Sequence, residues 1–95
     1  MSTVLTTAEI GLALGKLRGW TAQGNSIVRT FQFGNFVEAI NFVNKVAGVA
    51  EAANHHPDIS INYNKVTLAL VSHDAGGVTQ RDMKVAAAID KVAAR

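Results

Sequence analysis

Residues 35–70 decide the fold, and they read NFVEAINFVNKVAGVAEAANHHPDISINYNKVTLAL. In the first half of this stretch apolar side chains recur every three or four residues, which predicts an amphipathic helix over 36–54. Asn35 can cap its start, with Glu38 at the third helical position. Pro57 ends the helix, because proline disfavours helical backbone in the preceding residue and cannot donate a backbone hydrogen bond.

Beyond Pro57 the period changes from that of a helix to that of a strand. Apolar residues alternate with polar ones from Ile59 to Tyr63, and after a turn near 64–65 a second strand carries Val66 onward and ends at His73. A loop follows the second strand. We predict a last helix after it, capped by Thr79 with Asp82 at its third position.

The segment before residue 35 contributes a helix and a hairpin. Thr6 and Glu9 have the spacing of a capping box, which predicts a first helix ending near Gly19. A strand then reaches a turn at 24–26, and its partner strand runs over 27–33. Hairpins joined by helices favour an α+β fold. We therefore predict one domain over 1–95, a four-stranded antiparallel sheet with three helices packed on one face, in the order α-β-β-α-β-β-α.

Composition limits the protein to one small domain and excludes several kinds of site. The 95 residues are 48% apolar, enough for one core. Without cysteine there is no disulfide, thiolate metal site or cysteine nucleophile. The net charge of +2 is spread along the chain, so we expect no basic patch for nucleic acid. The N-terminus shows neither a secretory signal nor a membrane span, and we expect a soluble, cytoplasmic protein.

The three histidines lie between residues 55 and 73. His55 and His56 follow the central helix and His73 follows a strand, so the predicted topology brings them together from two directions. Glu51 precedes His55 by one helical turn, and we expect its carboxylate to reach that imidazole. Histidine exchanges protons near neutral pH, and such a cluster suits general acid–base catalysis.

Each of these residues also has a structural interpretation. A histidine at a helix C-terminus commonly acts as a capping group, and Glu51 can be a solvated helix residue. From alternation Tyr63 is a core side chain, and Asp82 is better explained as a helix cap than as chemistry. A carboxylate and a histidine one turn apart, with a further histidine, could also bind zinc, which leaves a metal-dependent hydrolase as an alternative.

The same residues carry a resemblance to a known family. Residues Glu51, His55-His56-Pro57, Tyr63, His73 and Asp82 are separated by three, five, nine and eight residues. This pattern resembles that of the pterin-4a-carbinolamine dehydratases, also known as dimerisation cofactors of a homeodomain transcription factor. The resemblance runs along nearly the whole chain, from Gly19-Trp20 to 73–77.

The resemblance implies dehydration of 4a-hydroxytetrahydropterin, the 4a-carbinolamine left by an aromatic amino acid hydroxylase, to quinonoid dihydropterin and water. It implies no metal and no cofactor. By position, His55 and His73 would be general acids towards the leaving hydroxyl, and His56 would bind the pterin and help remove the proton. Glu51 would orient and charge the cluster. The implied substrate-binding residues are Asn54, Asp58 and Ser72.

Family members also associate, through an edge strand and through the helix that here spans 36–54. We therefore expect a homodimer or homotetramer, with no membrane and no direct nucleic-acid binding. The family's second name leaves a non-catalytic dimerisation or coactivator module as an alternative function. Two departures bear on substrate contacts: Ile59 stands where some members carry an aromatic residue, and Asn54 where some carry Asp.

Overall fold

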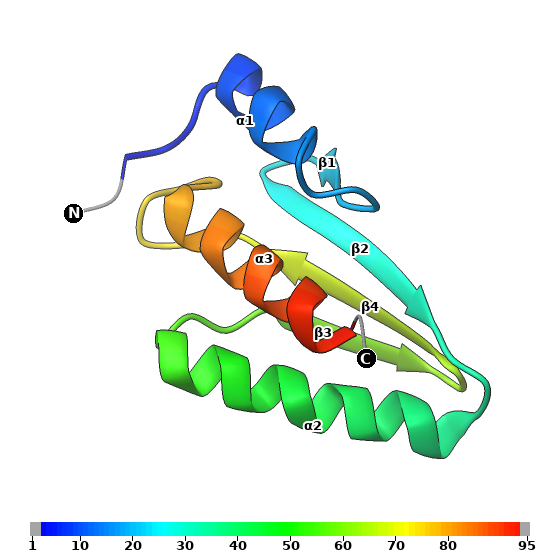
Figure 1. The fold of residues 1–95 in the computed structure, drawn as a ribbon. Helices are drawn as coiled ribbons and strands as arrows, with labels where there is room; N and C mark the ends of the chain where they lie inside the picture. The colour runs from blue at the N-terminus through cyan, green and yellow to red at the C-terminus, as the bar shows by residue number, and fades with distance from the viewer. Residues whose placement is uncertain (1–2, 94–95) are drawn as a thin grey trace.

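The computed structural model describes residues 3–93, which form three helices and four strands (Figure 1). In chain order these are α1 (Thr7–Leu14), β1 (Thr21–Gln23), β2 (Ser26–Gln32), α2 (Phe36–Ala53), β3 (Asp58–Asn62), β4 (Lys65–Leu70) and α3 (Gln80–Ala93). The order α-β-β-α-β-β-α and the α+β class are as predicted. Among the described helices, none combines the length and hydropathy that crossing a bilayer requires.

The four strands form one antiparallel sheet in the order β1-β2-β4-β3, so the two halves of the chain meet between β2 and β4. The helices cover one face of this sheet (Figure 1). Phe31 of β2 lies opposite Val66 of β4, and both side chains are buried in the core that the sheet forms with the helices. On the other face the hydroxyl groups of Thr30 and Thr67 lie 2.9 Å apart. One packed face and one open polar face are typical of antiparallel sheets.

The helical side of the core comes mainly from α2 and α3, which pack against each other. The side chain of Asn35 caps α2 as predicted and accepts a hydrogen bond from the Glu38 amide at 2.9 Å. Phe42 of α2 is buried, and its ring centroid lies 4.7 Å from that of Phe31. Truncating a buried phenylalanine of this kind costs about 3–5 kcal/mol. Because α2 and α3 also pack against each other, the C-terminal end of α2 and the N-terminal end of α3 lie at the same end of the molecule (Figure 1).

The first helix is shorter than predicted. Its capping box is present, with reciprocal hydrogen bonds of 2.8 and 3.1 Å between Thr6 and Glu9. The helix nevertheless ends at Leu14 and not near Gly19. After it, the amide of Leu17 bonds the carbonyl of Leu14, three residues back, which is a tighter turn than that of an α-helix. Glycines in this segment make a longer helix less favourable.

Two further predictions, around β3 and β4, were wrong. The turn between these strands is formed by Tyr63 and Asn64, one residue earlier than predicted. Tyr63 therefore leaves the alternation of β3: its φ is +54° and its side chain is 63% exposed rather than in the core. Strand β4 ends at Leu70 and not at His73, because the backbone of Ser72 bonds within the turn that follows.

Candidate active site

The backbone at the C-terminal end of α2 directs the side chains of the two adjacent histidines towards different partners. Asn54, the residue after α2, has a φ of 50°, a left-handed conformation that asparagine adopts more readily than most residues. The amide of His55 then donates to the carbonyl of Ala50 at 3.1 Å, which turns the chain away from the helix. His55 and His56 consequently pair with different carboxylates.

His55 pairs with Asp82 of α3. Its Nε2 atom lies 2.6 Å from Oδ1 of Asp82. The Asp82 side chain is fully buried and the His55 side chain is 11% exposed. A short hydrogen bond between an imidazole and a carboxylate, shielded from water, holds the ring in one orientation. This pair connects the end of α2 to the first turn of α3.

The other oxygen of Asp82 accepts two further hydrogen bonds. Its Oδ2 atom is 2.8 Å from the amide nitrogen of Thr79 and 2.9 Å from the hydroxyl of Ser72. The bond from Thr79 is the helix cap that the sequence predicts. Asp82 therefore caps α3 and also holds His55, a second role that its spacing from Thr79 did not indicate.

Glu51 pairs with His56 and not with His55. Its Oε2 atom lies 2.5 Å from Nε2 of His56, and the two side chains are 78% and 55% exposed. The expected contact between Glu51 and His55 is wrong, because the left-handed Asn54 interrupts the helical phase on which the four-residue spacing depends. The second histidine after the helix takes this place instead.

His73 lies in the turn that follows β4. The amide of Ser72 donates to the carbonyl of Gly77 at 3.0 Å and closes this turn, from which His73 is exposed. The next residue, Asp74, accepts a hydrogen bond of 2.6 Å from Arg81 of α3. The Arg81 guanidinium holds the pKa of the Asp74 carboxyl below its usual value of 3.8 through this bond. The ion pair ties the His73 turn to α3.

Covalent bonds and hydrogen bonds connect the three histidines, which we call the histidine cluster. His73 follows Ser72 in the chain, and Ser72 donates to Asp82. Asp82 in turn pairs with His55, which precedes His56. The end of α2, the turn after β4 and the start of α3 lie at the same end of the molecule (Figure 1). The topology therefore brings the segments that carry the histidines to one end of the molecule, as expected.

The three residues expected to bind substrate occupy different environments. Asn54 and Asp58 are exposed on either side of the adjacent histidines, at the end of α2 and the start of β3. Ser72 is fully buried, and its hydroxyl is bonded to Asp82 and Thr79. Its hydroxyl is therefore not free to contact a ligand, which does not fit the substrate-binding role that the resemblance implies for Ser72.

A three-ligand metal site does not form from the residues that the zinc alternative invoked. Over residues 3–93 no three side chains of His, Cys, Asp or Glu are gathered to hold a metal ion. Glu51 pairs with His56, whereas His55 pairs with Asp82. The observed arrangement is two histidine–carboxylate pairs, which suit proton transfer.

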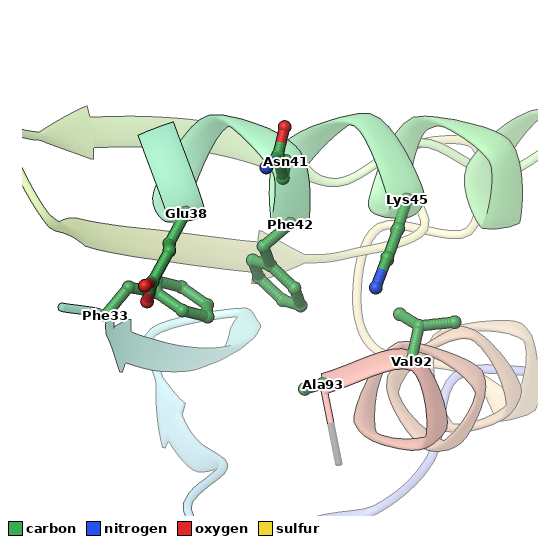
Figure 2. A pocket seen from close by; sticks show the side chains of 7 residues that line it. All are labelled: Phe33, Glu38, Asn41, Phe42, Lys45, Val92 and Ala93. Atoms are coloured by element: carbon green, nitrogen blue, oxygen red, sulfur yellow. The ribbon is translucent and has the colours of Figure 1, made fainter. Parts of the chain in front are cut away.

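A cavity of about 230 Å³ lies at the other end of α2 and α3. Figure 2 shows it between these helices, with Lys45 of α2 pointing towards Val92 of α3 and the ring of Phe33 beside Glu38. Its lining residues are Phe33, Glu38, Asn41, Phe42, Lys45, Val92 and Ala93. None of the histidines borders this cavity, so it is separate from the cluster.

The amino-acid sequence of residues 3–92 matches the family model described as pterin 4 alpha carbinolamine dehydratase. This match covers almost the whole chain, including all the residues of the histidine cluster. The chain belongs to the pterin 4 alpha carbinolamine dehydratase family.

Curated relatives in this family are similar over nearly their full length. A protein of Koribacter versatilis (strain Ellin345) is 54% identical over 92 residues, which are 97% of this chain and 98% of the relative. A protein of Roseiflexus sp. (strain RS-1) is 56% identical over 92 residues, 97% of this chain and 99% of the relative. Both are named for pterin-4-alpha-carbinolamine dehydratase.

Solved structures show the same fold. The crystal structure of a transcriptional coactivator/pterin dehydratase from Brucella melitensis superposes with a TM-score of 0.91 at 35% identity, covering 95% of this chain and 98% of that one. A pterin dehydratase-like protein identified as a RuBisCO assembly factor in the alpha-carboxysome shares the fold at a TM-score of 0.68 and 24% identity, covering 80% and 90%. The dehydratase fold thus occurs in proteins described with different roles.

Proposed function

We propose that this member of the pterin 4 alpha carbinolamine dehydratase family dehydrates 4a-hydroxytetrahydropterin to quinonoid dihydropterin and water. The observation that carries this proposal is the pairing of two adjacent histidines with two separate carboxylates. A third histidine is exposed in the turn after β4. The names of the 54% and 56% identical relatives support the same reaction.

The reaction needs one proton delivered and one proton removed. The C4a–O bond breaks with its electron pair staying on oxygen, and a general acid protonates the departing hydroxyl to give water. The N5 lone pair forms the new C4a=N5 bond, and N5 loses its proton to a base. No electrons are gained or lost overall, so acid–base groups supply the chemistry that the atoms require.

The histidines divide these tasks. We assign His55 and His73 as general acids towards the leaving hydroxyl, according to the face of the pterin that carries it, and His56 to pterin binding and proton removal. Glu51 orients His56 and stabilises the imidazolium that forms when His56 takes the proton. Because Asp82 holds His55 in one orientation, we add it as a positioning residue. Asn54 and Asp58 border the substrate, and Ser72 supports Asp82 from behind.

The test supplies 4a-hydroxytetrahydropterin from a working aromatic amino acid hydroxylase and follows formation of the quinonoid product. His55→Ala, His56→Ala and His73→Ala should each slow it, since general acid–base groups contribute about 10²–10⁴-fold. Asn41→Ala, at the distant cavity, is the control and should leave the rate unchanged. If no histidine substitution lowers the rate by about tenfold, the assignment fails. A chelator should leave the rate unchanged; a loss would favour the metal-dependent hydrolase.

The outer surface supports a homodimer or homotetramer. Strand β3 is a free edge of the sheet, all its residues are exposed, and they include Ile59 and Ile61. Apolar Phe36 and Val37 at the start of α2 are also exposed. Pairing of edge strands between subunits would cover unpaired backbone groups. Sedimentation at micromolar concentration should show an oligomer, and a monomer would contradict this part of the proposal.

A non-catalytic dimerisation or coactivator module is the second candidate. It is favoured by the description of the Brucella melitensis protein, 35% identical, as a transcriptional coactivator as well as a pterin dehydratase. The two candidates separate in the assay above, because a module of this kind needs no turnover. An oligomeric wild-type protein without dehydratase activity would favour it.

A further inference from the structure

Two buried hydroxyl groups are connected to Asp82 by hydrogen bonds, and the assignment above uses only one of them, that of Ser72. Ser72 and Thr79 are both fully buried, from the turn after β4 and from the residue before α3. Their hydroxyl oxygens lie 2.8 Å apart. The Thr79 oxygen also accepts the amide of Arg81 at 3.2 Å, and the Ser72 oxygen lies 2.9 Å from Oδ2 of Asp82. These contacts form one connected path to the carboxylate.

The hydrogen bonds along this path can run in only one direction, because each hydroxyl group has a single hydrogen to donate. A carboxylate can only accept, so the one hydroxyl hydrogen of Ser72 goes to Asp82. The contact between the two hydroxyl groups then needs the hydrogen of Thr79, which must donate to Ser72. Thr79 accepts in turn from the Arg81 amide, which has a hydrogen to give. Every donor along the path therefore points towards Asp82.

The number of available hydrogens also determines which ring nitrogen of neutral His55 carries its hydrogen. Oδ2 of Asp82 receives the Ser72 hydroxyl and the Thr79 amide, which leaves Oδ1 facing Nε2 of His55 at 2.6 Å. If Nε2 carried no hydrogen, both atoms of this contact would be acceptors and no hydrogen would lie between them. Nε2 therefore carries the hydrogen, and in the neutral ring Nδ1 is the nitrogen free to take a proton.

We propose that Ser72 and Thr79 are positioning residues that hold Asp82 so that His55 keeps a hydrogen on Nε2, which leaves Nδ1 as the nitrogen that takes up the proton the general acid then delivers to the leaving hydroxyl. The part that concerns substrate rests on the proposed function. The part that concerns the tautomer is a property of the protein alone. A wrong tautomer in an otherwise intact histidine–aspartate pair is known to cost orders of magnitude in rate.

The tautomer is measured by two-bond proton–nitrogen NMR correlations in the full ¹⁵N-labelled chain, at a pH where His55 is neutral. Wild-type protein should show the hydrogen on Nε2. Ser72→Ala removes one of the two hydrogen bonds that hold Oδ2 of Asp82, which lets the carboxylate turn away from Nε2. A fraction of neutral His55 should then carry its hydrogen on Nδ1, and kcat should fall on the order of tenfold with little change in KM. Thr79→Val should act in the same direction, and Thr79→Ser, which keeps the hydroxyl, should restore wild-type behaviour.

Thr30→Ala is the matched control, because it removes one member of the hydroxyl pair on the open face of the sheet. It should change neither tautomer nor kcat. The proposal is overturned if neutral His55 in wild-type protein carries its hydrogen on Nδ1, a result that needs no variant to fold. It is also overturned if Ser72→Ala changes neither readout. Wild-type protein with the expected tautomer but no turnover would refute the proposed function and leave the tautomer assignment standing.

Discussion

The two adjacent histidines differ more from each other than their positions in the chain suggest. His55 is 11% exposed and pairs with a fully buried aspartate on another helix, whereas His56 is 55% exposed and pairs with a glutamate that is 78% exposed on the helix it follows. A buried pair loses much when one partner is removed, because the other is left without water or a counter-charge. An exposed pair is screened by solvent and salt and contributes little.

Asp82→Asn should have the largest effect. It replaces an acceptor of three hydrogen bonds by an amide that can donate towards His55, so we expect kcat to fall by at least about 100-fold. The free energy of unfolding should fall by about 3 kcal/mol, the cost of breaking a buried pair. Dehydratase kinetics and urea unfolding measure the two effects.

Asp90→Asn is the control for this variant, since Asp90 lies on the same helix and accepts hydrogen bonds from Arg29 and Trp20. It should lose stability and retain kcat. If Asp82→Asn and Asp90→Asn have the same kcat, the buried pair has no role in catalysis and the contrast between the two histidines is only one of packing.

Glu51→Gln should have an intermediate effect. An exposed ion pair contributes about 0–1 kcal/mol, so we expect the free energy of unfolding to change by no more than that and kcat to fall by less than about tenfold. Added salt should reduce the difference between this variant and wild-type protein. A loss of kcat as large as that of Asp82→Asn would show that exposure does not distinguish the two pairs.

Asp74→Asn should have the smallest effect and a specific pH dependence. Because the hydrogen bond from Arg81 lowers the pKa of folded Asp74 below 3.8, the ion pair stabilises the protein above that pH, and the stabilisation is lost as the pH falls through the lowered pKa. Urea midpoints of wild type and variant, measured from neutral to acidic pH, should differ at neutral pH and converge in acid. A difference that persists in acid would mean that Asp74 acts other than through its charge.

Local patterns predicted most of the fold because they depend on nearby residues. The reciprocal bonds of Thr6 and Glu9 and the cap at Asn35 are present as expected, and the change of period at Pro57 correctly separates a helix from a hairpin. The errors lie at ends of elements. Tyr63 left the alternation because the turn began one residue earlier, and one residue is enough to change the face of a side chain.

The carboxylate partners of the histidines could not be predicted in the same way. The four-residue spacing of Glu51 and His55 assumes a continuous helix, and the left-handed backbone at Asn54 removes that assumption. Asp82 has a sufficient local explanation as a cap, so nothing in its immediate sequence indicates His55 as a second partner. Their contact depends on α2 and α3 packing side by side on the sheet.

The amino-acid sequence by itself determined the α+β class and the order of the elements, since helical and strand periods and caps act over a few residues. It also supplied the three histidines, whose chemistry suits proton transfer. Tertiary structure alone decided which histidine is buried and which carboxylate each of the two adjacent histidines contacts. It also decided that the Ser72 hydroxyl is buried against Asp82 and is not exposed to a ligand. Those features arise from contacts between residues far apart in the chain, and burial there makes each hydrogen bond a requirement.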